Sequence, residues 1–166
     1  QNGPNSIFEA ALEKPVLVNM AAASLVALIE WLKNSDILAL AKECDITFYL
    51  WFVTDGSPAS NKLLMQSLQR FRGTVPHIVV RNYGRSHNWQ PFESDEALAS
   101  LIQETETAIM SLPKFHGTTE RQTIADRHLS LVAASQDESF GIISRQRIKK
   151  FIRESGEAFA ATGLFK

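Results

Sequence analysis

Residues 46–53 have the sequence Ile-Thr-Phe-Tyr-Leu-Trp-Phe-Val. Apolar or aromatic side chains occupy both alternating sets of positions, which predicts a β-strand with both of its faces covered. Strands of this kind are typical of parallel sheets, whose faces are covered by helices. The turn-forming residues 54–58 follow directly and predict the end of the strand. This stretch therefore favours an α/β fold.

Further strands and helices are expected on both sides of this stretch. Apolar runs predict strands at residues 15–20, 75–80 and, more weakly, 108–110. Helical spacing of apolar residues predicts helices at 24–33, 36–43, 64–72, 96–104, 119–134 and 142–161. Such alternation predicts a single α/β domain over residues 1–166, in which a three-layer, mostly parallel sheet is flanked by helices.

The composition narrows the class of protein. The chain has 166 residues, 45% of them apolar, and a net charge of −1, which excludes a mainly disordered chain. The single cysteine, Cys44, excludes an internal disulfide, fits a reducing compartment and predicts a cytoplasmic protein; we expect its thiol to be buried. The chain begins with Gln1 rather than Met, which favours the C-terminal part of a longer protein.

Polar loops follow the predicted strands. In an open parallel sheet, ligands bind beyond the carboxyl ends of the strands, which selects the loops at residues 19–24, 54–60 and 81–89. The Asn82 amide can pair with an adenine edge, because it offers a donor and an acceptor together. Arg81 and Arg85 suit phosphate or an acidic partner. Ordinary turn chemistry with two solvated arginines explains the same residues.

Four stretches and the last helix carry a resemblance to a known family. The stretches are Pro-Val-Leu-Val-Asn-Met-Ala-Ala-Ala-Ser (15–24), Phe-Val-Thr-Asp-Gly-Ser-Pro-Ala-Ser (52–60), His-Ile-Val-Val-Arg-Asn-Tyr-Gly (77–84) and Ile-Met-Ser-Leu-Pro (109–113). In this order they resemble the later part of the MinD/ParA-type P-loop ATPases. The resemblance is greatest to the branch found in plasmid mobilisation and conjugal-transfer proteins.

The resemblance implies a P-loop NTPase-like fold and a nucleotide site. Asn19 falls at the acidic end of the family's Walker B strand, and Asn82 falls where the family has an adenine-contacting Asn. Asp55 lies in the loop after the next core strand, and Arg81 completes the expected nucleotide-binding set. The implied protein is a homodimeric, ATP-dependent switch in plasmid conjugal transfer, mobilisation or partition, with ATP and Mg as cofactors.

Two departures from the family limit this expectation. The chain contains no Gly-Lys pair, so the family's phosphate loop is absent, and Asn19 replaces the Walker B aspartate. Phosphoryl transfer depends on positioning and charge stabilisation, so this chain alone should not hydrolyse ATP. ATP and Mg are expected only if the full protein has the loop. In the family the phosphate-loop strand lies inside the sheet, so its absence predicts an exposed strand edge.

Other functions stay open. The chain could be a non-catalytic protein- or DNA-interaction module that keeps the NTPase-like fold. It could also be a small α/β enzyme that holds a phosphorylated metabolite through Arg81 and Arg85. The four histidines lack zinc-site spacing, and Ser57 lacks the G-x-S-x-G context of a serine hydrolase, so neither class is supported. No metal-ligand set is expected within this chain.

The last predicted helix is strongly basic. It carries Arg145, Arg147, Lys149, Lys150 and Arg153, with no acidic residue among them. Arg145, Lys149 and Arg153 recur every four residues and predict one charged face. Such a face suits DNA phosphates, conjugation or partition proteins with acidic surfaces, or a membrane surface. It also suits the solvated side of an ordinary amphipathic helix.

Overall fold

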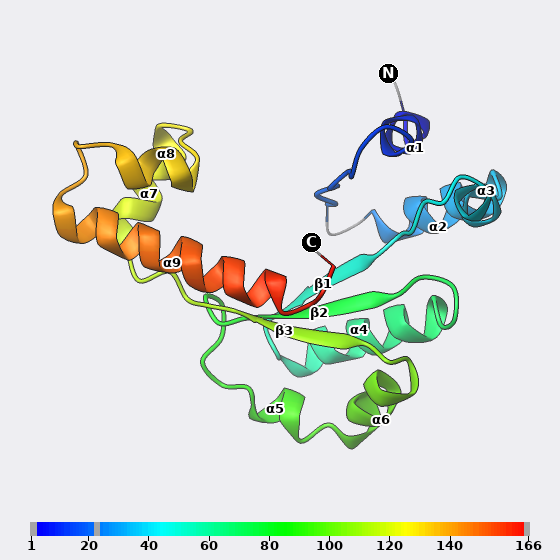
Figure 1. Ribbon diagram of the computed structural model, residues 1–166. Coiled ribbons are helices and arrows are strands. Elements are labelled where there is room, and N and C mark those ends of the chain that lie inside the picture. The colour runs from blue at the N-terminus through cyan, green and yellow to red at the C-terminus, as the bar shows by residue number, and fades with distance from the viewer. Residues whose placement is uncertain (1–2, 22–23, 165–166) are drawn as a thin grey trace. The chain divides into compact units, whose positions relative to one another are not determined.

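A computed structural model describes residues 3–21 and 24–164 of the chain (Figure 1). The chain divides into two compact units, residues 1–48 and residues 49–166. Each unit has its own helices, and all three strands belong to the second unit.

The first unit contains three short helices. They are α1 (Asn5–Ala11), α2 (Leu25–Asn34) and α3 (Ile37–Glu43). The apolar faces of α2 and α3 are buried at Leu32, Ile37 and Ala41. Trp31 of α2 donates a hydrogen bond from Nε1 to Asn5 Oδ1 at 3.0 Å, and its ring meets the Phe48 ring edge-on. Trp31 thus ties α1 to α2.

Residues 15–20 do not form the strand that their sequence predicts. The segment is irregular, and its apolar side chains are exposed, with Leu17 at 90% of its full accessible surface. A β-branched run becomes a strand only when a second strand satisfies its backbone hydrogen bonds. No strand pairs with this segment in the described part of the chain. The expectation of a buried strand here is wrong, and Ala22 and Ala23 of the following loop lie outside the described residues.

The second unit is built on a parallel sheet. Its strands are β1 (Leu50–Thr54), β2 (His77–Asn82) and β3 (Ala108–Leu112), in the spatial order β1-β2-β3. Both neighbouring pairs are parallel, and Val53, Val80 and Met110 lie side by side across the sheet. β1 begins later than its sequence predicts, because the Ile46 N–H bonds to the Ala41 carbonyl at the end of α3.

Helices cover both faces of this sheet and make three layers (Figure 1). On one face, Val79 and Phe52 pack against the cluster formed by α4 (Pro58–Arg70), α5 (Gln90–Glu93) and α6 (Glu96–Glu104). On the other face, Ile78, Val80 and Met110 pack against the C-terminal end of α9 (Ile142–Ala160). The predicted class, an α/β fold with a parallel sheet flanked by helices, is confirmed.

The other end of α9 extends beyond the sheet and packs against two shorter helices (Figure 1). These are α7 (Thr118–Asp126) and α8 (Leu131–Gln136), where the sequence predicts one helix. His128 has a φ of 51°, a left-handed conformation that interrupts a helix. Ser130 then caps α8 by accepting a hydrogen bond from the Ala133 N–H. Ala134, Phe140 and Ile148 form the buried centre of this helical end.

Two surface features complete the description. Cys44, at the C-terminal end of α3, is exposed, so the expectation of a buried thiol is wrong. It follows the last buried position of that short helix, Ala41. Within residues 3–21 and 24–164, none of the helices has both the length and the apolar content needed to cross a membrane.

Candidate functional site

An open hollow lies where β1 and β2 end. Because the two strands are parallel, the loops that follow their carboxyl ends meet at one edge of the sheet. The hollow has a volume of about 410 Å³ and is lined by Val53, Thr54, Asp55, Ser57, Ser60, Leu63, Asn82 and Arg85. Two of the residues predicted from the sequence, Asp55 and Asn82, are therefore brought together.

The loop between β1 and α4 is fixed by its own hydrogen bonds. The buried Thr54 hydroxyl accepts from the Gly56 N–H at 3.0 Å and lies 2.8 Å from the Ser60 hydroxyl. Ser57 caps α4 by accepting from the Ser60 N–H, and Pro58 begins the helix, where a missing N–H costs nothing. These contacts follow from the sequence Thr-Asp-Gly-Ser-Pro and hold Asp55 at the edge of the hollow.

Gly56 holds this loop against the next one. Its φ of 74° lies in the left-handed region, and a Cβ at this position would meet the Trp89 ring at 2.7 Å. Trp89 is buried and packs against Tyr83 and Phe92, all three from the segment that follows β2. The loop after β1 therefore rests on an aromatic cluster supplied by the segment after β2.

Asp55 is held as a carboxylate. Its Oδ1 accepts from the Ser57 N–H at 3.0 Å. This backbone hydrogen bond, then the Ser57 hydroxyl and, less strongly, the positive charge of Arg85 lower the pKa of Asp55. The hollow therefore contains one fixed negative charge opposite the guanidinium of Arg85.

Asn82 is the last residue of β2, and its side-chain oxygen takes part in the following turn. Its Oδ1 accepts from the Gly84 N–H at 3.0 Å, which closes the turn that the sequence also allowed. Among the described residues, no hydrogen-bond acceptor is found for its Nδ2. Both N–H donors of the amide are thus left for a ligand in the hollow, while the oxygen already accepts from Gly84.

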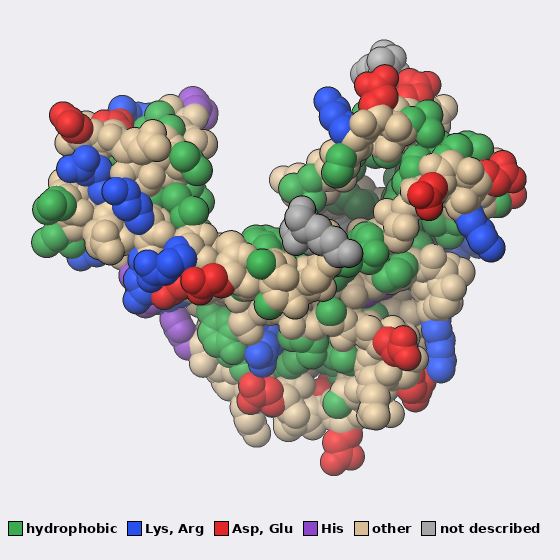
Figure 2. Space-filling model, viewed as in Figure 1, with side chains coloured by type: hydrophobic (Ala, Val, Ile, Leu, Met, Phe, Trp, Pro, Cys, Tyr) green, Lys and Arg blue, Asp and Glu red, His purple; other side chains and the backbone are tan. Residues whose placement is uncertain are grey.

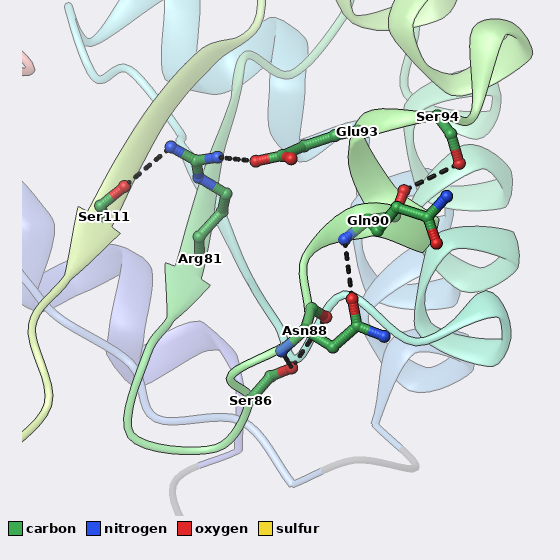
Figure 3. Close-up of polar contacts among 7 residues, drawn as sticks. All are labelled: Arg81, Ser86, Asn88, Gln90, Glu93, Ser94 and Ser111. Carbon is green, nitrogen blue, oxygen red and sulfur yellow. Dashed lines mark hydrogen bonds and ion pairs between the residues drawn. The ribbon is translucent and has the colours of Figure 1, made fainter.

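Arg81 does not line the hollow. Figure 3 shows its guanidinium between Ser111 of β3 and Glu93 of α5, with Nη2 3.0 Å from Ser111 Oγ and Nη1 3.4 Å from Glu93 Oε1. Arg85, in contrast, lines the hollow. The two arginines do not share one site, so a phosphate clamp made by both is not supported.

The sequence did not indicate which residues contact the Arg81 guanidinium. The guanidinium also lies 5.8 Å from the centre of the Tyr83 ring and 5.9 Å from that of Trp89. Glu93 belongs to α5, a short helix inside a stretch that reads as a loop, and Ser111 lies on another strand. Figure 3 shows the bonds at the two ends of α5: the Gln90 N–H donates to Asn88 Oδ1, and the Ser94 hydroxyl donates to the Gln90 carbonyl. No short-range sequence signal joins these positions.

Asn19 belongs to the first unit. It is exposed and lies in the irregular segment 15–20, so it does not end a strand. The role that the resemblance gives it depends on a strand that is not formed here.

The basic residues of α9 differ in their surroundings. Lys149 is exposed, Arg145 is half-buried, and Arg153 is exposed with Glu157 3.9 Å away. Arg147 forms a 2.9 Å ion pair with Glu120 of α7, and Lys150 lies 3.7 Å from Glu154. Figure 2 shows Lys and Arg side chains gathered over the end of the second unit that contains α7, α8 and the start of α9.

A second hollow, of about 420 Å³, lies beside the Arg147–Glu120 pair. It is lined by Thr119, Glu120, Thr123, Ser139, Phe140, Gly141, Ser144 and Arg147. The Glu120 side chain is only 6% exposed. A hydrogen bond from Ser144, together with others including one from Arg147, lowers the pKa of Glu120. The pair is therefore a satisfied ionic contact between α7 and α9, which sequence reasoning missed because its partners lie far apart in the chain.

The hollow at the sheet edge fits part of a nucleotide only. The two donors of the Asn82 amide suit a base. The triphosphate and its Mg²⁺ do not fit, because Arg85 is the only cation in the lining and the ionised Asp55 repels phosphate. Within the described residues, no group of three or more His, Cys, Asp or Glu side chains is arranged to hold a metal ion.

Comparisons with known proteins give no relative. No family model, no curated protein and no solved structure matches the chain. The resemblance to the MinD/ParA-type ATPases therefore stays a prediction that rests on the quoted motifs.

Proposed function

We propose that this chain is part of a MinD/ParA-like, ATP-dependent switch with a P-loop NTPase-like fold, acting in plasmid conjugal transfer, mobilisation or partition. One observation carries the proposal: Asp55 and Asn82, which follow successive strands, line one hollow at the carboxyl ends of β1 and β2. Ligands of open parallel sheets bind at this edge. The order of the motifs along the chain is the reason for choosing the MinD/ParA-type family.

In this proposal the hollow takes the adenine end of the nucleotide. Asn82 Nδ2 donates to the base, and the loop 81–89 packs beside it. The phosphates belong to a Gly-Lys-Ser/Thr loop that this sequence does not contain. The chain alone therefore binds adenosine nucleotides weakly and hydrolyses none. In a switch of this kind, ATP binding joins two copies of the protein into a homodimer, and ATP hydrolysis separates them.

A ligand titration followed by amide NMR tests this proposal. We expect adenosine, AMP and ATP to shift the same signals, those of Asn82, Gly84 and Asp55, with similar affinity, because the phosphates gain no contacts. Asn82→Ala should abolish these shifts. Asn34→Ala, an exposed asparagine of the first unit, is the matched control and should leave them unchanged. Absence of any shift at millimolar nucleotide, or equal binding by Asn82→Ala, contradicts the proposal.

A second candidate function is a non-catalytic interaction module that binds a polyanion or a partner protein through α9. Its support is the run of exposed cations on that helix, with no acidic residue from 142 to 153. This function needs neither nucleotide nor dimerisation. Full activity of the chain in partner binding, without ATP, would favour it over the switch.

A further inference from the structure

The start of α9 presents one continuous exposed face. Gln146, Lys149, Lys150 and Arg153 follow Ile142 at helical intervals, so their side chains lie along the same side of the helix. Ile142 and Ile143 are 77% and 67% exposed. Burying an isoleucine stabilises a contact by about 1.5–3 kcal/mol, so such exposure of two adjacent isoleucines in the first turn marks a surface for contact.

Charge on this face has a definite pattern. At about 100° of rotation per residue, Ile142 and Gln146 lie along the centre of the face in the first turns, and Arg153 continues this line further along the helix. Arg145 and Lys149 lie on one flank and Lys150 lies on the other, beside Ile143, whereas Arg147 lies further round and is paired with Glu120. Cations thus border the short uncharged strip formed by Ile142 and Gln146 on both sides. Acidic residues return only at Glu154 and Glu157, before α9 reaches the sheet.

The opposite side of α9 is held by α8. Ile148 is fully buried against Ala134 of α8 and Phe140 of the connecting turn 137–141. α8 and this turn thus support α9 along its buried side, and its outer face stays exposed. The exposed face is therefore carried on a rigid support.

We propose that α9 enters the major groove of duplex DNA, with Ile142 and Gln146 toward the base edges and the flanking cations Arg145, Lys149 and Lys150 toward the two phosphate strands. The major groove is about 12 Å wide and accepts one helix. Cations on both flanks match its two phosphate walls. A glutamine amide pairs with adenine, and apolar side chains contact thymine methyl groups. This inference deepens the second candidate function and requires no nucleotide.

Other anionic surfaces match this face less well. An interfacial helix inserts a broad apolar stripe into a membrane. The apolar stripe of α9 is already used, since Ile148 is buried and Phe151 and Ile152 are partly buried against their neighbours. An acidic protein surface gives no reason for cations on two flanks of an uncharged strip.

Fluorescence anisotropy with the full chain and labelled random-sequence duplexes tests the proposal. We expect duplex binding that weakens steeply with salt, and that is the same with and without ATP. Lys149→Gln and Arg153→Gln should each reduce affinity roughly tenfold at 0.1 M salt and lower the salt slope by about 0.9. Lys62→Gln, an exposed lysine on α4, removes the same charge elsewhere and should have no such effect. Far-ultraviolet circular dichroism checks that each variant is folded.

Base reading is tested by selection from a random duplex library. We expect an enriched sequence motif, and Gln146→Ala should lower the preference for one A·T pair roughly fivefold or more without changing the salt slope. Four outcomes would overturn the proposal. They are no duplex binding at 50 mM salt, no difference between the α9 variants and Lys62→Gln, no enriched motif, and tighter binding to vesicles of anionic lipid or to polyglutamate than to duplex. Loss of nucleotide binding at Asn82 would leave these results unchanged, so the two functions fail separately.

Discussion

Residues 15–20 and residues 50–54 are both short runs rich in apolar side chains, yet only the second run is a strand. Residues 50–54 form β1, which pairs with β2 along its whole length. Residues 15–20 have no paired strand in the described part of the chain, and their side chains face solvent. The difference teaches that the paired neighbour makes the strand, because isolated extended backbone leaves its polar groups to water.

The same difference separates the two loops that follow. The loop after β1 is anchored by Ser57, Thr54 and the Trp89 ring, so its functional groups have fixed positions. Asn19 and the loop after it have no comparable anchor within the described residues. Four measurements test whether pairing and anchoring explain the contrast between these two regions.

The largest expected effect is in the sheet. Ile78→Ala, at a position of β2 that is 2% exposed, should lower the free energy of unfolding by about 2–5 kcal/mol, because it leaves a cavity in the core. Leu17→Ala, in the exposed run, should change it by less than about 0.5 kcal/mol. Urea denaturation of both variants measures the contrast. Equal losses would mean that residues 15–20 are packed as a strand after all.

The next effect concerns the contact between the two loops. Gly56→Ala should destabilise the protein by about 2–4 kcal/mol, because it combines an unfavourable positive φ with a clash against Trp89. Gly73→Ala is the matched control: its φ of 71° is similar, but no atom lies within 4 Å of the added Cβ. It should cost only about 1 kcal/mol. Similar thermal shifts for both variants would show that the Trp89 contact has no energetic weight.

A smaller effect is expected at the helix cap. Ser57→Ala removes the hydroxyl that accepts from the Ser60 N–H and should cost about 1 kcal/mol of stability. Ser57→Thr keeps a hydroxyl that can accept from the Ser60 N–H and should retain most of that stability. Chemical denaturation of the pair provides the measurement, and an equal loss in Ser57→Thr would argue against capping as the cause.

The smallest effect is a pH dependence at Asp55. Its folded-state pKa is lowered by the Ser57 N–H, so its contribution to stability is present above the ordinary carboxyl pKa and is lost as pH falls through the folded value. Asp55→Asn should therefore flatten the fall of Tm on acidification below about pH 4. Asp45→Asn, an exposed aspartate of the first unit, is the comparison variant. If the Tm of Asp55→Asn falls on acidification as steeply as that of the unchanged protein, the Asp55 carboxylate does not stabilise the fold.

Prediction from the sequence was accurate where short-range patterns govern structure. The apolar run at β2 and the helical spacing of α9 each lie within a few residues and are formed close to the expected positions. Prediction was wrong where the structure of a segment depends on a partner far away in the chain, as at residues 15–20. The predicted helix 119–134 is divided because local strain at His128 and a new cap at Ser130 outweigh its apolar spacing.

The candidate site shows the same division. Asp55 and Asn82 could be paired in advance, because parallel strands end at one edge. The separation of Arg81 from Arg85 could not, since it depends on Ser111 and Glu93, which come from other elements. The ion pair between Glu120 and Arg147 likewise joins residues 27 positions apart.

The sequence by itself determined the α/β class, the turn that presents Asp55, and the basic, acid-free stretch of α9, because each depends on periodicity or on contacts between near neighbours. Only the tertiary structure decided which apolar run has a neighbouring strand, which arginine lines the hollow and which face of α9 is exposed. Those outcomes depend on contacts between segments far apart in the chain, and a local pattern carries no record of which distant segment will be its partner.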